Sequence, residues 1–356
     1  AHVNMIHHPI VNKAIPPNSE IPESCVGVRG KLYLVHELLP HPGGAAFIHL
    51  AAGTDATALF ETHHLNIQKA EARLPSSVGT YTSCVTEYDF TAYSHLRSQM
   101  LTRFPTRQSR RMRFHDRLIM HSCIIATLLL HVYAVTFRTA SLQWLGACIA
   151  SGIFNTLCGG FGHNGVHSLH PSACLLDWNG LSSFEWLFEH IASHHMFVNT
   201  KHDHDAISME PFVVWIPGRQ KPWLPPMGKH LIYAIAEFAV AIQGNLGHRL
   251  RWKADDRFPM WMRLAPWFFV LRITSYLAAG WFGLCSAALT LLVAGYSFAF
   301  LAHLNHVYGG NGLPDFVNQQ MINTRDLKPG IGAGILFLDR QRNHHLFPSV
   351  DQTLLA

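Results

Sequence analysis

The pattern of apolar and polar positions divides the chain into a mainly polar N-terminal part and two apolar blocks. Apolar runs at 118–137 and 142–160 are separated by only four residues. Each is close to the ~20 residues that cross the hydrocarbon core of a bilayer. A second block over 264–304 has room for two more spans, at 264–281 and 283–304. The pattern therefore predicts four transmembrane helices in two hairpins.

Two features qualify this assignment. Arg272 lies inside the third predicted span, where a charge costs about 2.5 to 3.5 kcal/mol on insertion scales. We therefore expect its guanidinium to face protein, water or a lipid head group. The apolar stretch 231–241 is too short to cross a bilayer, so we expect it to lie along the membrane surface.

Basic residues predict the orientation of the spans. Six arginines precede the first span between positions 103 and 117, and five Lys or Arg residues precede the third between 249 and 263. The positive-inside rule places both groups on the cytosolic side. The N-terminal part, the central loop 161–263 and the C-terminal tail are then all cytosolic.

The composition supports a membrane protein that binds metal. Charged residues make up 14% of the chain, against about 25% in an ordinary soluble domain. The 26 histidines almost equal the 27 Lys and Arg residues, and histidine is the commonest metal ligand. The net charge of +5 is too small and too localised to indicate a nucleic-acid partner. Seven cysteines without a C-x-x-C pair argue against a disulfide framework or a zinc ribbon.

An N-terminal segment carries a His41-Pro-Gly-Gly turn, followed by Gly53-Thr-Asp-Ala-Thr, Phe60 and the pair His63-His64. This segment resembles the cytochrome b5 family. The resemblance implies a haem b held by His41 and His64, with His63 as the alternative register. Two axial imidazoles let the iron pass electrons but leave it no open position for oxygen. The family's tryptophan near the domain start is absent around Cys25, and a plain surface turn at His41 is the competing interpretation.

Three histidine clusters follow in the rest of the chain. They are His163-x-x-x-His167, His190-x-x-x-His194-His195, and Gln341-x-x-His344-His345. Residues four apart lie on one face of a helix, so each of the first two clusters can converge on one ion. Seven imidazoles exceed the needs of one mononuclear site, which favours a dinuclear metal centre.

This ordered combination closely resembles the membrane fatty-acyl desaturases, and the fused b5-like segment together with Gln341 resembles their front-end branch. The resemblance implies two iron ions that activate O₂. A further ligand is implied at the end of the fourth span, where we favour His306 over His303 and Asn305, and Gln341 is either a ligand or a hydrogen-bonding neighbour. The implied metal ligands are His163, His167, His190, His194, His195, His306, Gln341, His344 and His345.

Together these observations predict a small α+β cytochrome b5-like haem domain at 20–80, a linker at 81–117, and an all-α integral membrane domain at 118–356 with four transmembrane helices and a cytosolic helical cap. The resemblance implies an O₂-dependent desaturase that acts on a fatty-acyl chain carried by coenzyme A or a lipid. Its electrons would pass through the fused haem from an NAD(P)H-dependent b5 reductase. The expected location is the endoplasmic reticulum membrane, with both sites facing the cytosol.

Other interpretations stay open at the level of sequence. A fatty-acyl or sphingoid-base hydroxylase would use the same ligands, whereas a metal transporter would need polar residues at midspan. A membrane-anchored haem electron carrier would leave the later clusters without a purpose. We expect 201–205 to be a solvated polar turn, and His121 and His131 to be packed or interfacial residues. The roles of His170, His202 and His204 are not determined by the pattern.

Overall fold

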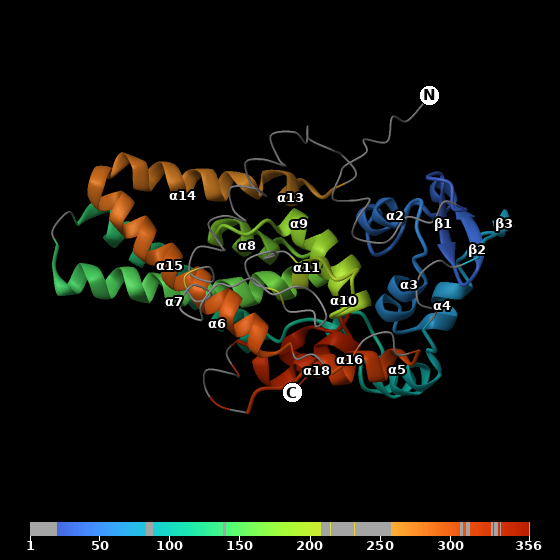
Figure 1. Cartoon of the computed structure of the whole chain (residues 1–356). Coiled ribbons are helices and arrows are strands. Elements are labelled where there is room, and N and C mark those ends of the chain that lie inside the picture. The colour runs from blue at the N-terminus through green and yellow to red at the C-terminus, as the bar shows by residue number, and fades with distance from the viewer. Residues whose placement is uncertain are drawn as a thin grey trace, which may run out of the picture.

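The computed structural model describes residues 20–82, 88–137, 140–207, 258–306, 309–310 and 314–355 except 329, 331–333 and 335, together with Val214 and Leu231. The expected surface stretch 231–241 lies outside these residues, apart from Leu231. So do the basic positions 249–257. In Figure 1 the N-terminal unit, in blue, lies at the opposite end of the molecule from the turns of the helical hairpins.

The N-terminal unit is a small α+β structure. Strands β1 (Cys25–Val28) and β2 (Lys31–Leu34) are antiparallel, and β3 (Gly79–Thr80) pairs with β2. Arg29 and Gly30, both with positive φ, make the tight turn between β1 and β2. Helices α2 (Ala45–Ala51), α3 (Thr57–His63) and α4 (Ile67–Glu71) follow. Every residue of β1 is buried, which places the core of the unit between its sheet and its helices.

Three helices are long and apolar enough to cross a membrane: α6 (Phe114–Thr136), α7 (Leu142–His167) and α15 (Gly280–Leu304). The first two match the predicted first hairpin, although α7 runs seven residues past the predicted end at position 160. This extension carries His163 and His167 on the same continuous helix as the span. The position of the first histidine cluster is therefore set directly by the apolar helix α7.

The third predicted span has a shorter helix than expected. Helix α14 (Pro266–Ala278) has 13 residues. At 1.5 Å per residue it spans about 20 Å, less than the ~30 Å hydrocarbon core. Helix α13 (Met260–Leu264) precedes it, and Pro266, which lacks a backbone N–H, begins α14. Within the described ranges, three helices and not four meet the length of a membrane span.

Arg272 is fully enclosed by protein, as expected for a charge inside an apolar helix. Its side chain is 1% exposed. The guanidinium donates to the carbonyl of Trp178 and lies 5.5 Å from the Trp178 ring and 5.9 Å from the Tyr276 ring. Aromatic faces and a carbonyl replace water around the charge. The expectation that Arg272 faces protein is confirmed.

A cap of short elements covers one end of the long helices. From the central region it contains α8 (Cys174–Asn179), α9 (Ser183–Trp186), the π-helix η4 (Leu187–His194), α10 (His195–Phe197) and α11 (His204–Ile207). From the C-terminal region it contains α16 (Phe316–Asn323), η6 (Leu338–Arg340), α18 (Gln341–Leu346) and η7 (Gln352–Leu354). The predicted linker contributes α5 (Thr91–Arg103), which packs on this cap through Tyr93 against Phe316 and Phe347.

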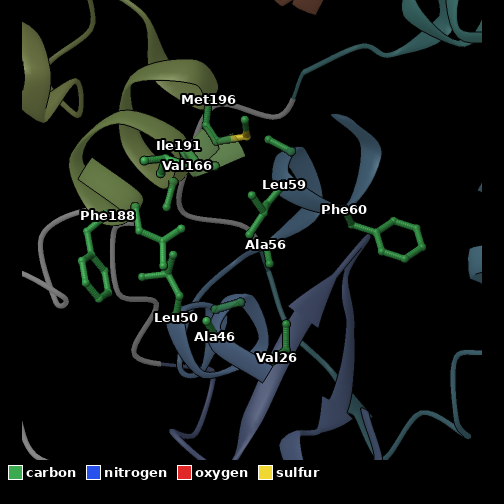
Figure 2. Close-up of a cluster of buried hydrophobic side chains, with 14 of the residues drawn as sticks. Val26, Ala46, Leu50, Ala56, Leu59, Phe60, Val166, Phe188, Ile191 and Met196 are labelled. Atoms are coloured by element: carbon green, nitrogen blue, oxygen red, sulfur yellow. The ribbon is translucent and has the colours of Figure 1, made fainter. Parts of the chain in front are cut away.

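The N-terminal unit and the cap share one hydrophobic core. Figure 2 shows Leu50 facing Phe188 and Leu59 facing Met196 across the boundary. The turn after His41 also approaches the cap closely, because a Cβ atom added at Gly44 would lie 3.1 Å from Leu169. Gly44 has φ +101°, a conformation that side-chain-bearing residues rarely adopt. The backbone angle therefore favours glycine at this junction, and a side chain here would also displace the end of Leu169 by a few tenths of an ångström.

Candidate metal centres

The structure brings the histidines of all three clusters together in the cap. Helix α7 supplies His163 and His167, η4 with α10 supplies His190, His194 and His195, and α18 supplies His344 and His345. His306, two residues after the end of α15, joins them. The side chains form two all-histidine groups, within each of which the potential ligand atoms lie within 4.8 Å of one another, and His190 and His194 form a third such group with Asp205. The five-histidine group is His163, His167, His190, His195 and His344, and the three-histidine group is His194, His306 and His345.

The ring nitrogens converge in a way that suits metal ions. In the five-histidine group the Nε2 atom of His163 lies 2.7 Å from that of His190 and 3.2 Å from that of His344. In the three-histidine group the Nε2 atom of His306 lies 2.9 Å from that of His194 and 3.1 Å from that of His345. In such an arrangement the lone pairs of neutral imidazoles point toward one another and repel. A bound cation offsets this repulsion. The donor set therefore fits two metal ions.

The π-helix explains why the second cluster contributes to both groups. The backbone N–H of His195 bonds to the carbonyl of His190, five residues earlier, instead of four as in an α-helix. His190 and His195 consequently share the five-histidine group, with Nε2 atoms 3.1 Å apart, while His194 points into the three-histidine group. His190 and His194 nevertheless remain close, as their four-residue spacing predicts, because their ring centroids are 5.1 Å apart and both lie with Asp205 in a third group of potential ligand atoms.

Hydrogen bonds to the Nδ1 atoms orient the rings. In the three-histidine group His194 bonds to Asp203 at 2.9 Å, His306 to the Ala302 carbonyl at 2.7 Å, and His345 to Gln320 at 3.0 Å. Each Nδ1–H then donates, and the Nε2 lone pair faces the group's centre. In the five-histidine group His190 bonds to Asp205 at 2.9 Å.

The other rings of the five-histidine group are held differently. The Nδ1 atoms of His167, His195 and His344 are buried and have no hydrogen-bond partner among the described residues. Their orientation comes from packing, since the His167 ring lies 4.6 Å from the rings of both His195 and His344.

Burial sets the protonation of the rings outside the spans. It lowers the pKa of His190, His195, His344 and His345 well below the ordinary value for histidine, and neighbouring imidazoles lower these pKa values further. Burial and then His194 lower the pKa of His306 to about 3. Burial also opposes the charged form of His194, but the Asp203 carboxylate outweighs it and raises the pKa of His194. Except for His194, these rings are held neutral, which is the form that binds metal.

One expectation about the polar turn at 201–205 is wrong. Asp203 is fully buried and its two carboxylate oxygens lie 2.9 and 3.0 Å from the Nδ1 atom of His194. Asp203 also accepts from the backbone N–H groups of Asn199 and Ala206, so the turn wraps around its carboxylate. The alternation of His and Asp in this stretch was the available signal, because carboxylates commonly orient ligating histidines. Gln320, on α16, carried no comparable signal.

The remaining sequence candidates lie near the groups without belonging to them. Gln341 lies with its Nε2 atom 3.2 Å from that of His306. Asn305 donates to the carbonyls of Arg325 and Leu338, and His303 contacts the Ala299 carbonyl through Nδ1. His170 caps the short helix η3 (Pro171–Ala173) by accepting from the Ser172 N–H. Of the three positions considered at the end of the fourth span, His306 is the one that lies in a group.

The two predicted haem ligands face each other in the N-terminal unit. The ring centroids of His41 and His64 are 5.7 Å apart. The Nδ1 atom of His64 bonds to the Phe60 carbonyl at 2.9 Å, which leaves its Nε2 lone pair free to bind a metal. Burial, and then the charge of His64, lowers the pKa of His41, and burial lowers that of His64. Two opposed neutral imidazoles fit a haem iron with two axial histidines.

His63 points elsewhere. Its Nδ1 atom lies 3.0 Å from the Thr62 hydroxyl, its ring packs 5.6 Å from Phe47, and its Nε2 atom is buried without a hydrogen-bond partner. Burial and then His64 lower the pKa of His63 to about 3. The facing pair is therefore His41 with His64.

A cavity is lined by residues of α7 and α15 and by four of the histidines. Its walls include Gly160 and Gly295, which have no side chains, and the apolar side chains of Phe298 and Leu301. His163, His190, His194 and His306 also line it. A further lining residue is Glu189, whose pKa is raised well above the ordinary value by burial and then by Glu185 and Asp205. The cavity therefore joins apolar side chains of the long helices to members of both histidine groups.

Paired histidine metal centres at the end of apolar helices, joined to a haem-type unit, define a class of membrane-associated oxidoreductase. The model of the fatty acid desaturase family matches residues 139–356, and that of the cytochrome b5-like haem/steroid binding domain matches residues 17–105. The first match covers more than half of the chain. The chain belongs to the fatty acid desaturase family.

Similar proteins share both parts. A cytochrome b5-related protein of Drosophila melanogaster is 24% identical over 88% of this chain and 76% of its own length. An acyl-lipid (8-3)-desaturase of Physcomitrium patens is 25% identical over 90% of this chain and 78% of its own length. An acyl-lipid (8-3)-desaturase of Mortierella alpina is 24% identical over 92% of this chain and 84% of its own length. No solved structure is significantly similar to the chain.

The two families also define the cofactors. Desaturases of this type are diiron enzymes and the b5-like domain binds haem. The eight converging imidazoles and the facing pair in the N-terminal unit are chemically suited to these groups. The chain is therefore an oxidoreductase with two separate iron-containing sites.

Proposed function

We propose that this protein is a front-end acyl desaturase that uses O₂ and electrons from its own haem domain. The observation that carries the proposal is the convergence of eight imidazoles from three sequence clusters and the end of α15, four of which line a cavity that residues of α7 and α15 also line. The names of the acyl-lipid desaturases that resemble it over most of its length support the substrate class.

The proposed ligands are the members of the two groups, with Gln341 as a neighbour whose side-chain amide lies 3.2 Å from the Nε2 atom of His306. A diiron pair supplies the oxidant that can remove hydrogens from an unactivated methylene, which side chains cannot do alone. The reaction removes two hydrogens from adjacent methylenes, and O₂ leaves as two molecules of water. Four electrons are required, two from the substrate and two from the haem, which an NAD(P)H-dependent b5 reductase would re-reduce. The chain's own residues hold the ligand rings, enclose the acyl chain and exclude water from it.

The proposed topology has four spans, at 118–137, 142–160, 264–281 and 283–304. The helix α14 would complete the second hairpin together with α13 or with local thinning of the bilayer. The haem domain at 20–80, the linker at 81–117 and the cap would face the cytosol, by the positive-inside rule applied to the arginines at 103–117. The endoplasmic reticulum is the proposed membrane.

The test is expression in a host of known lipid composition, followed by mass spectrometry that locates new double bonds. The wild type should yield a new unsaturation, and the double variant His344→Ala/His345→Ala should yield none. The variant His121→Ala, at an exposed position on α6, is the matched control and should behave as wild type. A new hydroxyl group without a double bond would favour the hydroxylase, and unchanged lipids with an intact haem spectrum would favour the electron carrier.

A further inference from the structure

The haem unit is built into the catalytic part of the molecule instead of being tethered beside it. Val26, Leu50 and Leu59 from the N-terminal unit share a core with Phe188 and Met196 from the cap (Figure 2). Each of these five side chains is at most 7% exposed. Burial of this kind is typical of a permanent interface, since separating the parts would expose all of this apolar surface to water.

Polar contacts reinforce the interface. The buried ion pair between Arg97 and Glu61 connects α5 to α3, and Arg97 also donates to the Glu61 carbonyl. Tyr93 donates to the carbonyl of Thr62 at 3.4 Å, while its ring packs on Phe316 of the cap. Helix α5 therefore links the end of α3, where the haem ligand lies, to the cap that carries the metal groups.

At one point this interface brings the two sites within a few residues of each other. The Thr62 hydroxyl oxygen lies 3.7 Å from the sulfur of Met196. Thr62 is two residues from His64, and Met196 directly follows His195 of the five-histidine group. His63, between Thr62 and His64, lies within electrostatic range of His167 in the same group.

We infer that electrons cross from the haem to the diiron site through the contact between Thr62 and Met196. The inference rests on the proposed function, in which the haem reduces the iron pair. The route has one through-space step, and the rest of it follows covalent bonds from His64 to Thr62 and from Met196 to His195. One electron passes at a time: the haem is oxidised from ferrous to ferric, one ferric ion of the cluster is reduced to ferrous, and no bond or proton is exchanged. Thr62 and Met196 are positioning residues in this scheme.

The experiment measures electron transfer without substrate or product. In the purified full-length chain, loaded with haem and ferric iron and kept free of oxygen, the haem is reduced by a flash of light with a photosensitiser. Its absorbance then reports reoxidation by the iron pair. The rate constant reports the route, while the amplitude reports the fraction of molecules loaded with iron, so loss of iron is not mistaken for slow transfer.

Met196→Ala should open a gap at the contact and lower the rate constant severalfold, and Met196→Leu, which keeps most of the volume, should restore most of it. Leu50→Ala is the matched control, because it removes a side chain of similar size from the same interface away from the contact. It should leave the rate constant close to that of the wild type. Equal slowing by Leu50→Ala, or an unchanged rate constant in Met196→Ala, would overturn the route.

This outcome is distinct from failure of the proposed function. If the haem does not serve the iron pair at all, the wild type itself will show no reoxidation beyond that of metal-free protein. If only the route is wrong, the wild type will react quickly and the Met196 variants will match it.

Discussion

The two metal groups hold their imidazoles in different ways. In the three-histidine group every Nδ1 atom is hydrogen bonded, to Asp203, to the Ala302 carbonyl or to Gln320. In the five-histidine group three of the five Nδ1 atoms are buried without a partner, and the rings support one another by contact. A group with few ligands thus relies on directed hydrogen bonds, whereas a group with many relies on packing. Loss of a single interaction should therefore matter more in the three-histidine group.

The largest expected difference between the two groups is in iron retention after one ligand is removed. His345→Ala takes one of three imidazoles and should release about one of the two iron ions per chain and abolish product formation. His344→Ala takes one of five and should also abolish product formation but retain more iron. The measurement is the ratio of total iron to haem in the purified protein, with iron determined by elemental mass spectrometry and haem by its absorbance. Equal iron loss in the two variants would show that the number of remaining ligands does not decide retention.

The next effect concerns the two carboxylates. Asp203→Asn weakens the hold on His194 and should reduce metal affinity or activity by about 10- to 100-fold, as is usual for a partner of a ligating histidine. Asp205→Asn should do less, because the Asp205 side chain is 35% exposed and water can take its place beside His190. Iron titration of metal-free protein gives both affinities. A greater loss in Asp205→Asn would reverse the ranking, and an unchanged melting temperature in Asp203→Asn would show that its turn is intact.

A smaller effect is expected at Gln320. Its side chain accepts from His345 and donates to the His195 carbonyl. Gln320→Leu removes both bonds, each worth about 0.5 to 1.5 kcal/mol, which corresponds to a loss of about two- to tenfold per bond. Gln320→Glu keeps the acceptor for His345 and should recover most of the iron affinity. If the two variants were equally weak, the bond to the His195 carbonyl would be the important one.

The smallest difference concerns pH. The pKa of His194 is raised, whereas those of His344 and His345 are lowered well below the ordinary value. As pH falls through the pKa of His194, a proton competes with metal for this ring first. Protein loaded with two equivalents of metal should therefore release the metal of the three-histidine group before that of the five-histidine group as the pH falls from about 8 to 5, the range in which histidines titrate. Asp203→Asn should shift this loss to lower pH, and simultaneous loss of both equivalents would contradict the assignment.

The sequence alone predicted the chemistry of the site better than its internal arrangement. The histidine clusters are recognisable because their spacing is local, and the structure brings them together with His306. His41 and His64 are recognisable from the motifs around them, and the structure places them face to face in the N-terminal unit. The division of the second cluster between two groups depends on a π-helix, whose hydrogen bonding follows from packing and not from residue spacing. The buried role of Asp203 and the contribution of Gln320 depend on contacts between distant segments. Helix α14 lies within the predicted third span but is shorter than the hydropathy pattern indicated, so the fourth membrane crossing stays a prediction.

The π-helix also requires a fixed number of residues between His190 and His195. Between His190 and His195 the backbone completes a wide turn that an ordinary helix would complete with one residue fewer. Deleting any residue from this turn would relax it to regular winding and rotate everything beyond it, so that His194 and His195 would no longer point into their present histidine groups. Neighbouring side chains can adjust to a substitution in this turn, but they cannot compensate for an inserted or deleted residue.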